Sequence, residues 1–356
     1  MPRRLVTLPR TPGMALDIVS YGRRGPLAAG RLTGAQVAQV ERTVRRVPEV
    51  VVKVSGGARE RAGVLAHLKY IDRHGRLPIE TDDGRRLEGR EAAPSLTEEW
   101  ALELCAGAHR PRPADGQPDR RPKLVHNIVL SMPGRTPPEA VLAAARNFAR
   151  ENFALQYRYA MVLHTDQAHP HVHLVVKAEH EFEPRQRLVI RKSTLRDWRE
   201  QFAAFLREEG VAANATPRPL RGQTEAAKKD AVHHRLRDLA AYRALSPQER
   251  IERAPPVAST FMRIKVEAIA RTLGAPADGA EVSARHALAD SRQQVMADWS
   301  ATAAILRRQG LGGLAAEVER FAADLPAVQT ERERIARCLA DVLRASREAR
   351  TRGRDR

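Results

Sequence analysis

The stretch LHTDQAHPHVHLVV at positions 163–176 holds four of the twelve histidines of the chain, at 164, 169, 171 and 173. On an extended strand, residues two apart point to the same face, so His171 and His173 project together. The short polar connection at 165–170 is typical of a turn between two strands. Folding back at this turn brings His164, at the end of the preceding strand, within cross-strand reach of the other two histidines.

Three imidazoles on one face predict a divalent-metal site with open positions for the oxygens of a substrate. Asp166 fits the role of a carboxylate that holds an imidazole in its ligating tautomer, although it could also be an ordinary loop residue. His169 precedes a proline and is expected in the loop, so it ranks below the other three as a ligand, although it could approach a substrate. The alternative is a set of solvated or core histidines on a half-buried strand.

Strand and helix patterns alternate on both sides of this stretch. β-branched and apolar runs predict five strands, at residues 50–54, 123–131, 158–164, 171–177 and 187–191. Helices are predicted at residues 60–74, 95–106, 136–151 and 193–210, and capping boxes begin the second of them (Ser95 with Glu98) and the third (Thr136 with Glu139).

The helix predicted at 60–74 carries Tyr70 on the side opposite its apolar stripe, beside His67, Arg73 and His74. A core tyrosine would lie in the stripe, and most exposed tyrosines are plain surface residues. A phenol has an unperturbed pKa of about 10. To attack phosphorus at neutral pH it needs a neighbouring cation, a metal-bound phosphate or a base. The three neighbours of Tyr70 are of the right kinds.

The composition indicates a polyanionic partner. Among the 356 residues, 61 Lys and Arg stand against 43 Asp and Glu, a net charge of +18, which is typical of nucleic-acid binding. The alternative is a basic soluble protein that is simply rich in arginine. Cys105 and Cys338 lie far apart without metal-type spacing, which argues against a disulfide framework. Because no apolar run approaches the ~20 residues of a membrane span, we expect a cytoplasmic protein without membrane insertion.

Three stretches together resemble the relaxases of the HUH endonuclease superfamily, in the P-type mobilisation class that includes the border-nicking relaxases. HLKYIDRHG at 67–75 is similar to the family's nucleophile motif, and HNIVLSMP at 126–133 is similar to its middle motif. Residues 164–176 are similar to its metal motif. GVAANATPRPLRG at 210–222 also resembles the C-terminal edge of the family's domain.

The resemblance implies an α+β fold, in which a central antiparallel five-stranded sheet with packed helices occupies residues 47–222. A basic extension at 1–46 would precede this domain, and a mainly helical, Arg-rich region at 223–356 would follow it. Tyr70 would be the nucleophile, assisted by Asp166 and His164. The ligands of a Mg²⁺ or Mn²⁺ ion would be His164, His171 and His173.

The activity implied is site- and strand-specific nicking and rejoining of DNA at a transfer origin, through a 5′-phosphotyrosine link, during conjugative mobilisation. The DNA-binding candidates are Arg73, Arg187, Arg191, Arg218 and Arg221. Partners would be the single-stranded nick region, accessory relaxosome proteins and the coupling protein of a type IV secretion system. The protein could be translocated to a recipient cell while linked to DNA.

Three other interpretations stay open at this point. A replication initiator or transposase of the same superfamily would use the same chemistry. The run HPHVHLV at 169–175 formally matches the histidine-triad nucleotide hydrolases, in which a central histidine is the nucleophile and no metal is needed. A non-catalytic basic DNA-binding protein would carry its histidines incidentally.

Overall fold

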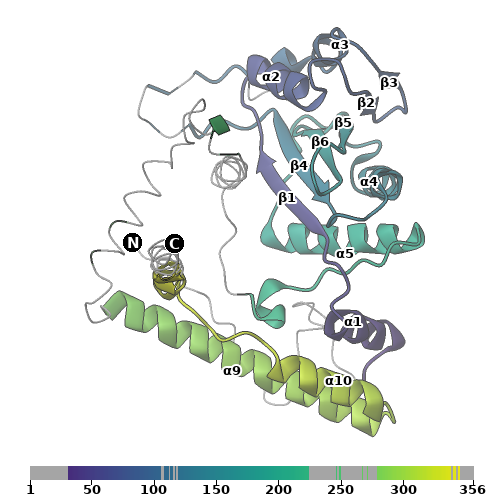
Figure 1. Ribbon diagram of the computed structural model, residues 1–356. Helices are drawn as coiled ribbons and strands as arrows, with labels where there is room; N and C mark the ends of the chain where they lie inside the picture. The colour runs from purple at the N-terminus through teal and green to yellow at the C-terminus, as the bar shows by residue number, and fades with distance from the viewer. Residues whose placement is uncertain are drawn as a thin grey trace. The chain divides into compact units, whose positions relative to one another are not determined.

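The computed structural model describes residues 31–105, 108–111, 119–223 and 279–337, with pairs and single positions between and after these ranges (Figure 1). The chain divides into two compact units. The sheet unit is Glu41–Thr216, and the helical unit combines Met1–Val40 with Pro217–Arg356. The predicted nuclease domain has the bounds 47–222, and the roles assigned to the flanking regions stay predictions.

The sheet unit is built on an antiparallel sheet with the strand order β1-β4-β6-β5-β2-β3 (Figure 1). Its strands are β1 Val51–Gly56, β2 Ile79–Thr81, β3 Arg86–Leu87, β4 Val125–Ser131, β5 Tyr159–His164 and β6 His171–Lys177. The α+β class, with an antiparallel sheet and packed helices, is therefore confirmed.

The sheet has six strands where the sequence predicts five. Strands β1, β4, β5 and β6 are the predicted ones, but residues 187–191 form only an isolated bridge from Arg187 to Glu179. The hairpin β2–β3 extends the sheet beyond β5 instead. Its strands are only three and two residues long, so they show no alternating pattern that sequence periodicity could detect.

Helices precede, separate and follow the strands. They are α1 Gly34–Val44, α2 Arg61–Ile71, α3 Ala92–Glu99, α4 Pro138–Phe153 and α5 Lys192–Glu208, with 3₁₀ turns at η2 Leu102–Leu104 and η3 Arg218–Arg221. The predicted capping box of Ser95 is wrong, because Ser95 lies inside α3 and its N–H bonds to the carbonyl of Glu91. The predicted cap at Thr136 is also wrong: Pro137 is the N-cap of α4, and the Thr136 hydroxyl donates to the carbonyl of Pro133.

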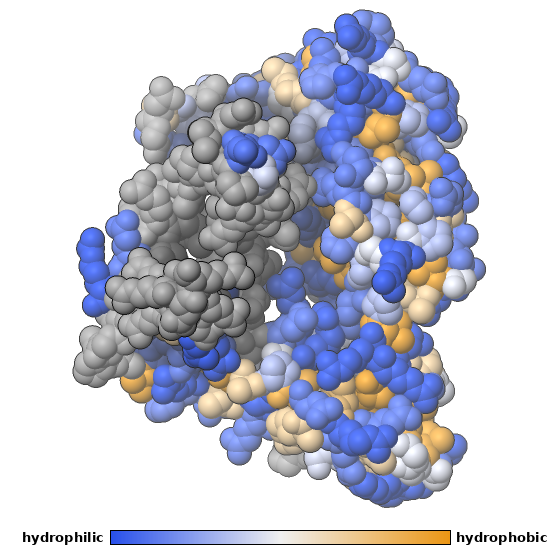
Figure 2. Space-filling view, viewed as in Figure 1, coloured by the Kyte–Doolittle hydropathy of each residue, from blue (hydrophilic) through white to orange (hydrophobic). Residues whose placement is uncertain are grey.

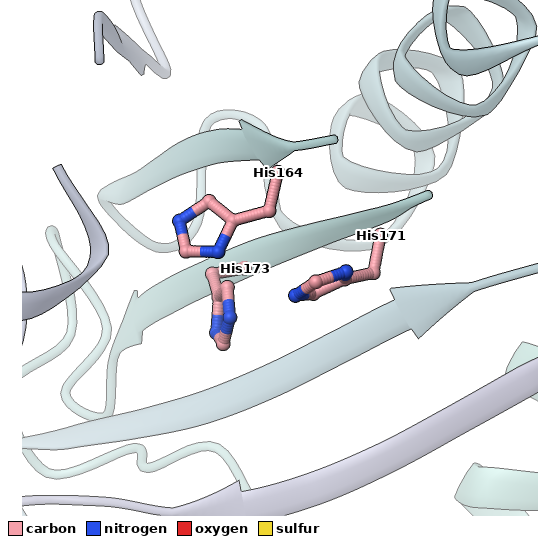
Figure 3. Close-up of side chains that lie close together, drawn as sticks. All are labelled: His164, His171 and His173. Carbon is pink, nitrogen blue, oxygen red and sulfur yellow. The ribbon is translucent and has the colours of Figure 1, made fainter. Parts of the chain in front are cut away.

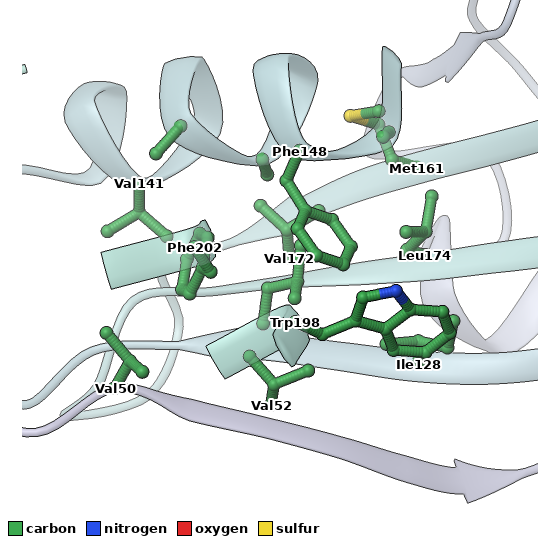
Figure 4. Close-up of a cluster of buried hydrophobic side chains, with 14 of the residues drawn as sticks. Val50, Val52, Ile128, Val141, Phe148, Met161, Val172, Leu174, Trp198 and Phe202 are labelled. Carbon is green, nitrogen blue, oxygen red and sulfur yellow. The ribbon is translucent and has the colours of Figure 1, made fainter. Parts of the chain in front are cut away.

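Helices pack on both faces of the sheet, and the alternation along each strand decides which side chains meet them. Under α4 and α5, the rings of Phe148, Trp198 and Phe202 meet edge to face, with the ring of Phe148 5.8 and 6.2 Å from the other two (Figure 4). Val172 and Leu174 of β6 join this core. The alternate residues His171, His173 and Val175 therefore face the opposite side, where α2 and α3 pack.

The helical unit contains α9 Gly279–Arg308 and α10 Gly312–Ala323. Trp299 packs against Phe321 at 5.2 Å, and Arg307 pairs with both carboxylate oxygens of Glu319 at 2.6 Å. These contacts hold the two helices together, and the predicted helical character of this region is confirmed for the residues that the structure describes.

Apolar side chains on the visible surface occur in small groups among hydrophilic ones (Figure 2). Within the described ranges, every helix is too short or too polar to cross a bilayer. Cys105 is buried and free, and Cys338 lies outside the described residues.

Candidate metal centre and tyrosine

Strand register brings the three histidines together on the face of the sheet that α2 and α3 share. His164 of β5 pairs directly with His171 of β6, and His173 lies two residues further along the same strand. The side chains point toward one another (Figure 3). Their ring centroids are 4.5 to 5.0 Å apart, and one nitrogen from each ring lies within 4.8 Å of the others. These rings are called the histidine triad below.

The histidine triad is uncharged at neutral pH. Burial lowers the pKa of His164 to about 4 and that of His173 to about 2, and it lowers the pKa of His171 as well. The neighbouring imidazoles and Arg73 lower the pKa of His173 further. Metal ligation requires the neutral imidazole, so the environment already holds the three rings in the form that binds an ion.

Hydrogen bonds to backbone carbonyls determine which ring nitrogen carries the proton. Nδ1 of His171 lies 2.9 Å from the carbonyl oxygen of His169, and Nε2 of His164 lies 2.6 Å from that of Ile71. A carbonyl only accepts, so these nitrogens carry the protons. The lone pairs are then on Nε2 of His171 and Nδ1 of His164.

The donor set fits a divalent transition-metal ion. Nδ1 of His173 is buried and has no hydrogen-bond partner within the described part of the chain, an arrangement that costs free energy unless something binds there. Three neutral imidazoles at this spacing suit ions such as Mn²⁺, and they leave further coordination positions open.

Tyr70 is in the last turn of α2, and its side chain is half exposed. The guanidinium of Arg73 lies 5.2 Å from the centre of its ring. The same guanidinium donates to Asp166 at 2.7 Å and lies 3.2 Å from Nδ1 of His164. Arg73 therefore connects the tyrosine, the carboxylate and the histidine triad.

The link from Asp166 to His164 runs through this guanidinium, whereas the sequence suggested that the carboxylate holds an imidazole directly. Partial burial alone would raise the pKa of Asp166. The hydrogen bond and charge of Arg73 outweigh that effect and hold the pKa below its usual range. Asp166 is thus an anion that anchors Arg73.

The turn after α2 aims Arg73 at the site. The helix was predicted to reach residue 74, but it ends at Ile71 because Arg73, His74 and Gly75 have φ values of +54°, +58° and +83°. A side chain on Gly75 would lie against the backbone of Gly89, with its Cβ 2.5 Å from the amide nitrogen of Arg90. Glycine is therefore required at this position by conformation and by space.

His67 lies one helical turn before Tyr70 and between two parts of the site. Its ring is 6.4 Å from that of Tyr70, at 27°, and 6.3 Å from that of His173. Burial lowers its pKa, and its Nε2 is buried without a described hydrogen-bond partner. The sequence indicates that His67 neighbours Tyr70, but its approach to His173 depends on how α2 packs on the sheet.

The other arginines predicted to bind DNA lie away from the triad or in the other unit. Arg187 donates to the carbonyl of Lys123 and lies 3.8 Å from Glu179, past the end of β6. Along the strand, Lys177 at that end is four residue steps from His173, about 13 Å, and six from His171, about 20 Å. Arg191 is the N-cap of α5, while Arg218 and Arg221 belong to η3 in the helical unit.

The sequence does not indicate that Lys53 lies on the same face of the sheet as the triad. In the register of β1 with β4, Lys53 pairs with Val129, which in turn pairs with His173. Lys53 is exposed on the face of the triad, and its charge helps to lower the pKa of His171, after burial as the main cause. Only the strand order, which periodicity does not reveal, could have identified it.

The alternative interpretation as a histidine-triad nucleotide hydrolase concerns a different set of histidines, namely His169, His171 and His173. The position of His169 argues against it. It requires three alternating histidines on one strand, but β6 begins at His171. The ring of His169 accepts a hydrogen bond from the backbone of Gly134 in another loop. The third converging imidazole is instead His164, from the neighbouring strand.

An antiparallel sheet with three converging imidazoles and a neighbouring tyrosine is the arrangement that the resemblance to HUH relaxases predicts. Residues 108–211 match the family "Relaxase: MobA/VirD2-like, nuclease domain". This segment includes β4, β5, β6, the histidine triad and Asp166, whereas Tyr70 lies outside it. The matched segment of the chain is therefore similar to the nuclease domain of these relaxases.

Similarity to two curated proteins points to the same kind of nuclease. The chain is 26% identical over 206 residues to the T-DNA border endonuclease VirD2 of Rhizobium radiobacter, an alignment covering 54% of this chain and 47% of that protein. It is 27% identical over 203 residues to the T-DNA border endonuclease VirD2 of Agrobacterium fabrum, covering 53% of this chain and 44% of that protein. The alignments thus span less than half the length of these relatives.

Proposed function

We propose that this chain nicks and rejoins one strand of DNA at a transfer origin or border, by transesterification onto Tyr70. The MobA/VirD2-like nuclease domain supports DNA nicking as the reaction. The observation that carries the finer proposal is Arg73, whose guanidinium contacts Tyr70, Asp166 and His164 at once. Tyr70 as nucleophile, Arg73 as cation and the histidine triad as metal ligands would then act on the same phosphate of the substrate.

In the proposed reaction, the phenolic oxygen of Tyr70 attacks the phosphorus of the scissile phosphodiester. The bond from phosphorus to the 3′ oxygen breaks, and this oxygen leaves with a proton as a 3′-hydroxyl. The phenol loses its proton, and the 5′ phosphate becomes a tyrosine ester. One phosphoester replaces another, so the step is reversible and the same site can rejoin the ends.

The chain's own residues would handle charge and protons. The Arg73 guanidinium beside the Tyr70 ring would stabilise the phenolate and the negative charge that develops on the phosphate oxygens. His67 is neutral at pH 7 because burial lowers its pKa, and it adjoins Tyr70. Both features support it as the acceptor of the phenolic proton.

His164, His171 and His173 would hold a divalent ion, Mg²⁺ or Mn²⁺. When bound, such an ion supplies a Lewis acid that polarises the scissile phosphate. Imidazole ligands favour Mn²⁺ over Mg²⁺ in intrinsic affinity. Asp166 would keep Arg73 oriented while the substrate binds.

The partners follow from the charge and from the relatives. A net charge of +18 supports binding to DNA, and Arg187, Arg191, Arg218 and Arg221 are proposed to contact its backbone outside the nick site. By analogy with the border endonucleases, we propose that accessory relaxosome proteins and a type IV coupling protein act with this chain. It would work in the cytoplasm and be translocated while linked to DNA, with the nuclease domain at 47–222 between a basic extension and a helical region.

The test uses labelled single-stranded oligonucleotides from the candidate transfer origin, incubated with the full chain in Mn²⁺ or EDTA and run on denaturing gels. We expect a metal-dependent cut that leaves the fragment with the 5′ phosphate linked to protein. Tyr70→Phe should abolish the adduct, while Tyr157→Phe, near His180, should not. Cleavage that survives Tyr70→Phe would move the nucleophile elsewhere, and tight binding without any adduct would favour a non-catalytic DNA-binding protein.

A further inference from the structure

We propose that His169 binds a phosphate of the DNA strand at the rim of the histidine triad. Its Nε2–H would donate to a phosphodiester next to the scissile one, while its Nδ1 holds two loops together. The inference rests on the proposed function, because the ligand is the single strand that Tyr70 would cut.

The tautomer of His169 is set by one hydrogen bond. The backbone N–H of Gly134 donates to Nδ1 of His169 at 2.8 Å. A backbone N–H only donates, so Nδ1 carries a lone pair and the proton of the neutral ring is on Nε2. The residue is exposed, and among the described residues Nε2 has no hydrogen-bond partner. His169 therefore presents an N–H donor that the protein itself does not use.

The loop that carries His169 is fixed to the loop between β4 and α4. The carbonyl of Pro170 accepts hydrogen bonds from the N–H of Met132 at 3.2 Å and from the hydroxyl of Ser131 at 3.3 Å. The loops pack so closely at Gly134 that a Cβ there would lie 2.6 Å from the carbonyl oxygen of Ala168. The donor is thus preorganised, which reduces the entropy cost of binding.

The same residue is tied to the triad. The carbonyl oxygen of His169 accepts the Nδ1 proton of His171 at 2.9 Å, so the backbone of His169 orients a metal-ligand ring. This contact joins the backbone of His169 to a ring of the triad, and we infer that a strand bound at the triad extends past the ring of His169. In single-stranded DNA, a phosphate next to the scissile one is the nearest group that such a donor can bind.

A cationic residue lies on the loop that holds His169. Arg135 follows Gly134, is exposed, and has a φ of 76°, in the left-handed region that non-glycine residues seldom adopt. Its guanidinium adds a charged donor to the loop that fixes His169. An imidazole N–H and a guanidinium together suit the oxygens of a phosphate, which only accept hydrogen bonds and carry negative charge.

The experiment separates the two nitrogens of His169. In His169→Asn the side-chain oxygen can still accept the N–H of Gly134, while the amide NH2 takes the place of the ring's Cδ2 and does not reach the position of Nε2–H. His169→Ala removes both groups. Mn²⁺ affinity is measured by calorimetry without DNA, and single-strand affinity by fluorescence anisotropy in EDTA, where no cleavage occurs. The control is His286→Asn, an exposed position on α9.

We expect His169→Asn to bind Mn²⁺ as wild type does and to bind the strand about tenfold more weakly, as for a lost hydrogen bond to a charged group. His169→Ala should lose affinity for both. A scan of single neutral methylphosphonates along the oligonucleotide should find one position that weakens binding by wild type but not by His169→Asn.

Unchanged strand affinity in His169→Asn would overturn the proposal, as would a methylphosphonate penalty that is the same in both proteins. Loss of Mn²⁺ affinity together with strand affinity in His169→Asn would also overturn it, because His169 would then only hold the loop. Failure of the proposed function is distinguishable, since it would leave wild type binding the strand without forming an adduct through Tyr70.

Discussion

The guanidinium of Arg73 donates a 2.7 Å hydrogen bond to the carboxylate of Asp166. The donating nitrogen also lies 3.2 Å from Nδ1 of His164, the nitrogen that would bind an ion. An ion can bind Nδ1 of His164 only when the Arg73 guanidinium has moved off this lone pair. The hydrogen bond to Asp166 then keeps the guanidinium beside Tyr70.

Neutralising this anchor should slow the reaction more than it weakens metal binding. The amide of Asp166→Asn can still accept a hydrogen bond but no longer holds Arg73 by charge. We expect nicking at saturating Mn²⁺ to slow by about 10- to 100-fold, the usual cost of losing a residue that orients a metal site. Calorimetry should show Mn²⁺ affinity within about threefold of wild type, since the half-exposed Asp166 carboxylate bonds to Arg73 and not to a ligand ring.

The matched control is Asp290→Asn, an exposed carboxylate on α9, which should nick at the wild-type rate. A wild-type rate in Asp166→Asn would mean that the charge of Asp166 does not matter to Arg73.

Metal binding should stabilise the fold. An ion that binds only the folded chain adds about 2.7 kcal/mol at 100 times its Kd. Mn²⁺ should therefore raise the melting temperature, and EDTA should reverse the effect. His171→Ala removes a ligand and should lose the Mn²⁺ shift, while His286→Ala should keep it. A shift of equal size in His171→Ala would place the ion elsewhere.

The sequence predicted the triad because two simple rules suffice for it. Alternation along β6 aligns His171 with His173, and a short turn returns His164 to the same face. Helical periodicity in α2 placed Tyr70 opposite the apolar stripe, and its side chain is half exposed there. Each of these inferences uses residues close together in the chain.

Features that depend on distant parts of the chain could not be predicted. Lys53 joins the face of the triad only through the pairing of β1 with β4, and His67 meets His173 only through the packing of α2. Arg187 is proposed to contact DNA because of its charge, but the sequence does not show that its guanidinium also donates to the carbonyl of Lys123. A sequence shows which residues are charged, but not which of them form hydrogen bonds or ion pairs within the fold.

Acid should destabilise the fold partly through His126. Burial lowers its pKa to about 4, with Lys123 and Arg187 adding to the effect. Since the pKa is about 6.5 in the unfolded chain, protons bind preferentially to the unfolded state as the pH falls between these values. The stability contribution is complete above about pH 6.5 and is lost toward pH 4, at up to about 1.4 kcal/mol per pH unit.

Denaturant unfolding at pH 7, 5.5 and 4.5, with EDTA present, measures this slope. His126→Gln should lose stability less steeply than wild type over the window, and His286→Gln should match wild type. Equal slopes in His126→Gln and wild type would show that His126 is protonated in the folded protein. The residual slope in His126→Gln should include the triad and His67, whose pKa values are also lowered by burial.

Gly75 and Gly84 make a matched pair for testing the turn that aims Arg73. Both have φ of +83°, but a Cβ on Gly84 meets nothing within 4 Å, whereas one on Gly75 would press against the backbone at Gly89 and Arg90. Alanine at Gly84 should cost about 1 to 2 kcal/mol of unfolding free energy, for the left-handed conformation alone. Alanine at Gly75 should cost about 1 to 3 kcal/mol more, because backbone atoms cannot move aside as a flexible side chain would.

The two variants should differ even more in activity. Gly75 lies two residues after Arg73, so any shift that relieves the clash moves the guanidinium away from Asp166 and Tyr70. Nicking by the folded fraction of Gly75→Ala should therefore be slower than that of Gly84→Ala, which should match wild type. Equal losses of stability and rate in both variants would mean that only the left-handed conformation matters, and that close packing against Gly89 does not position Arg73.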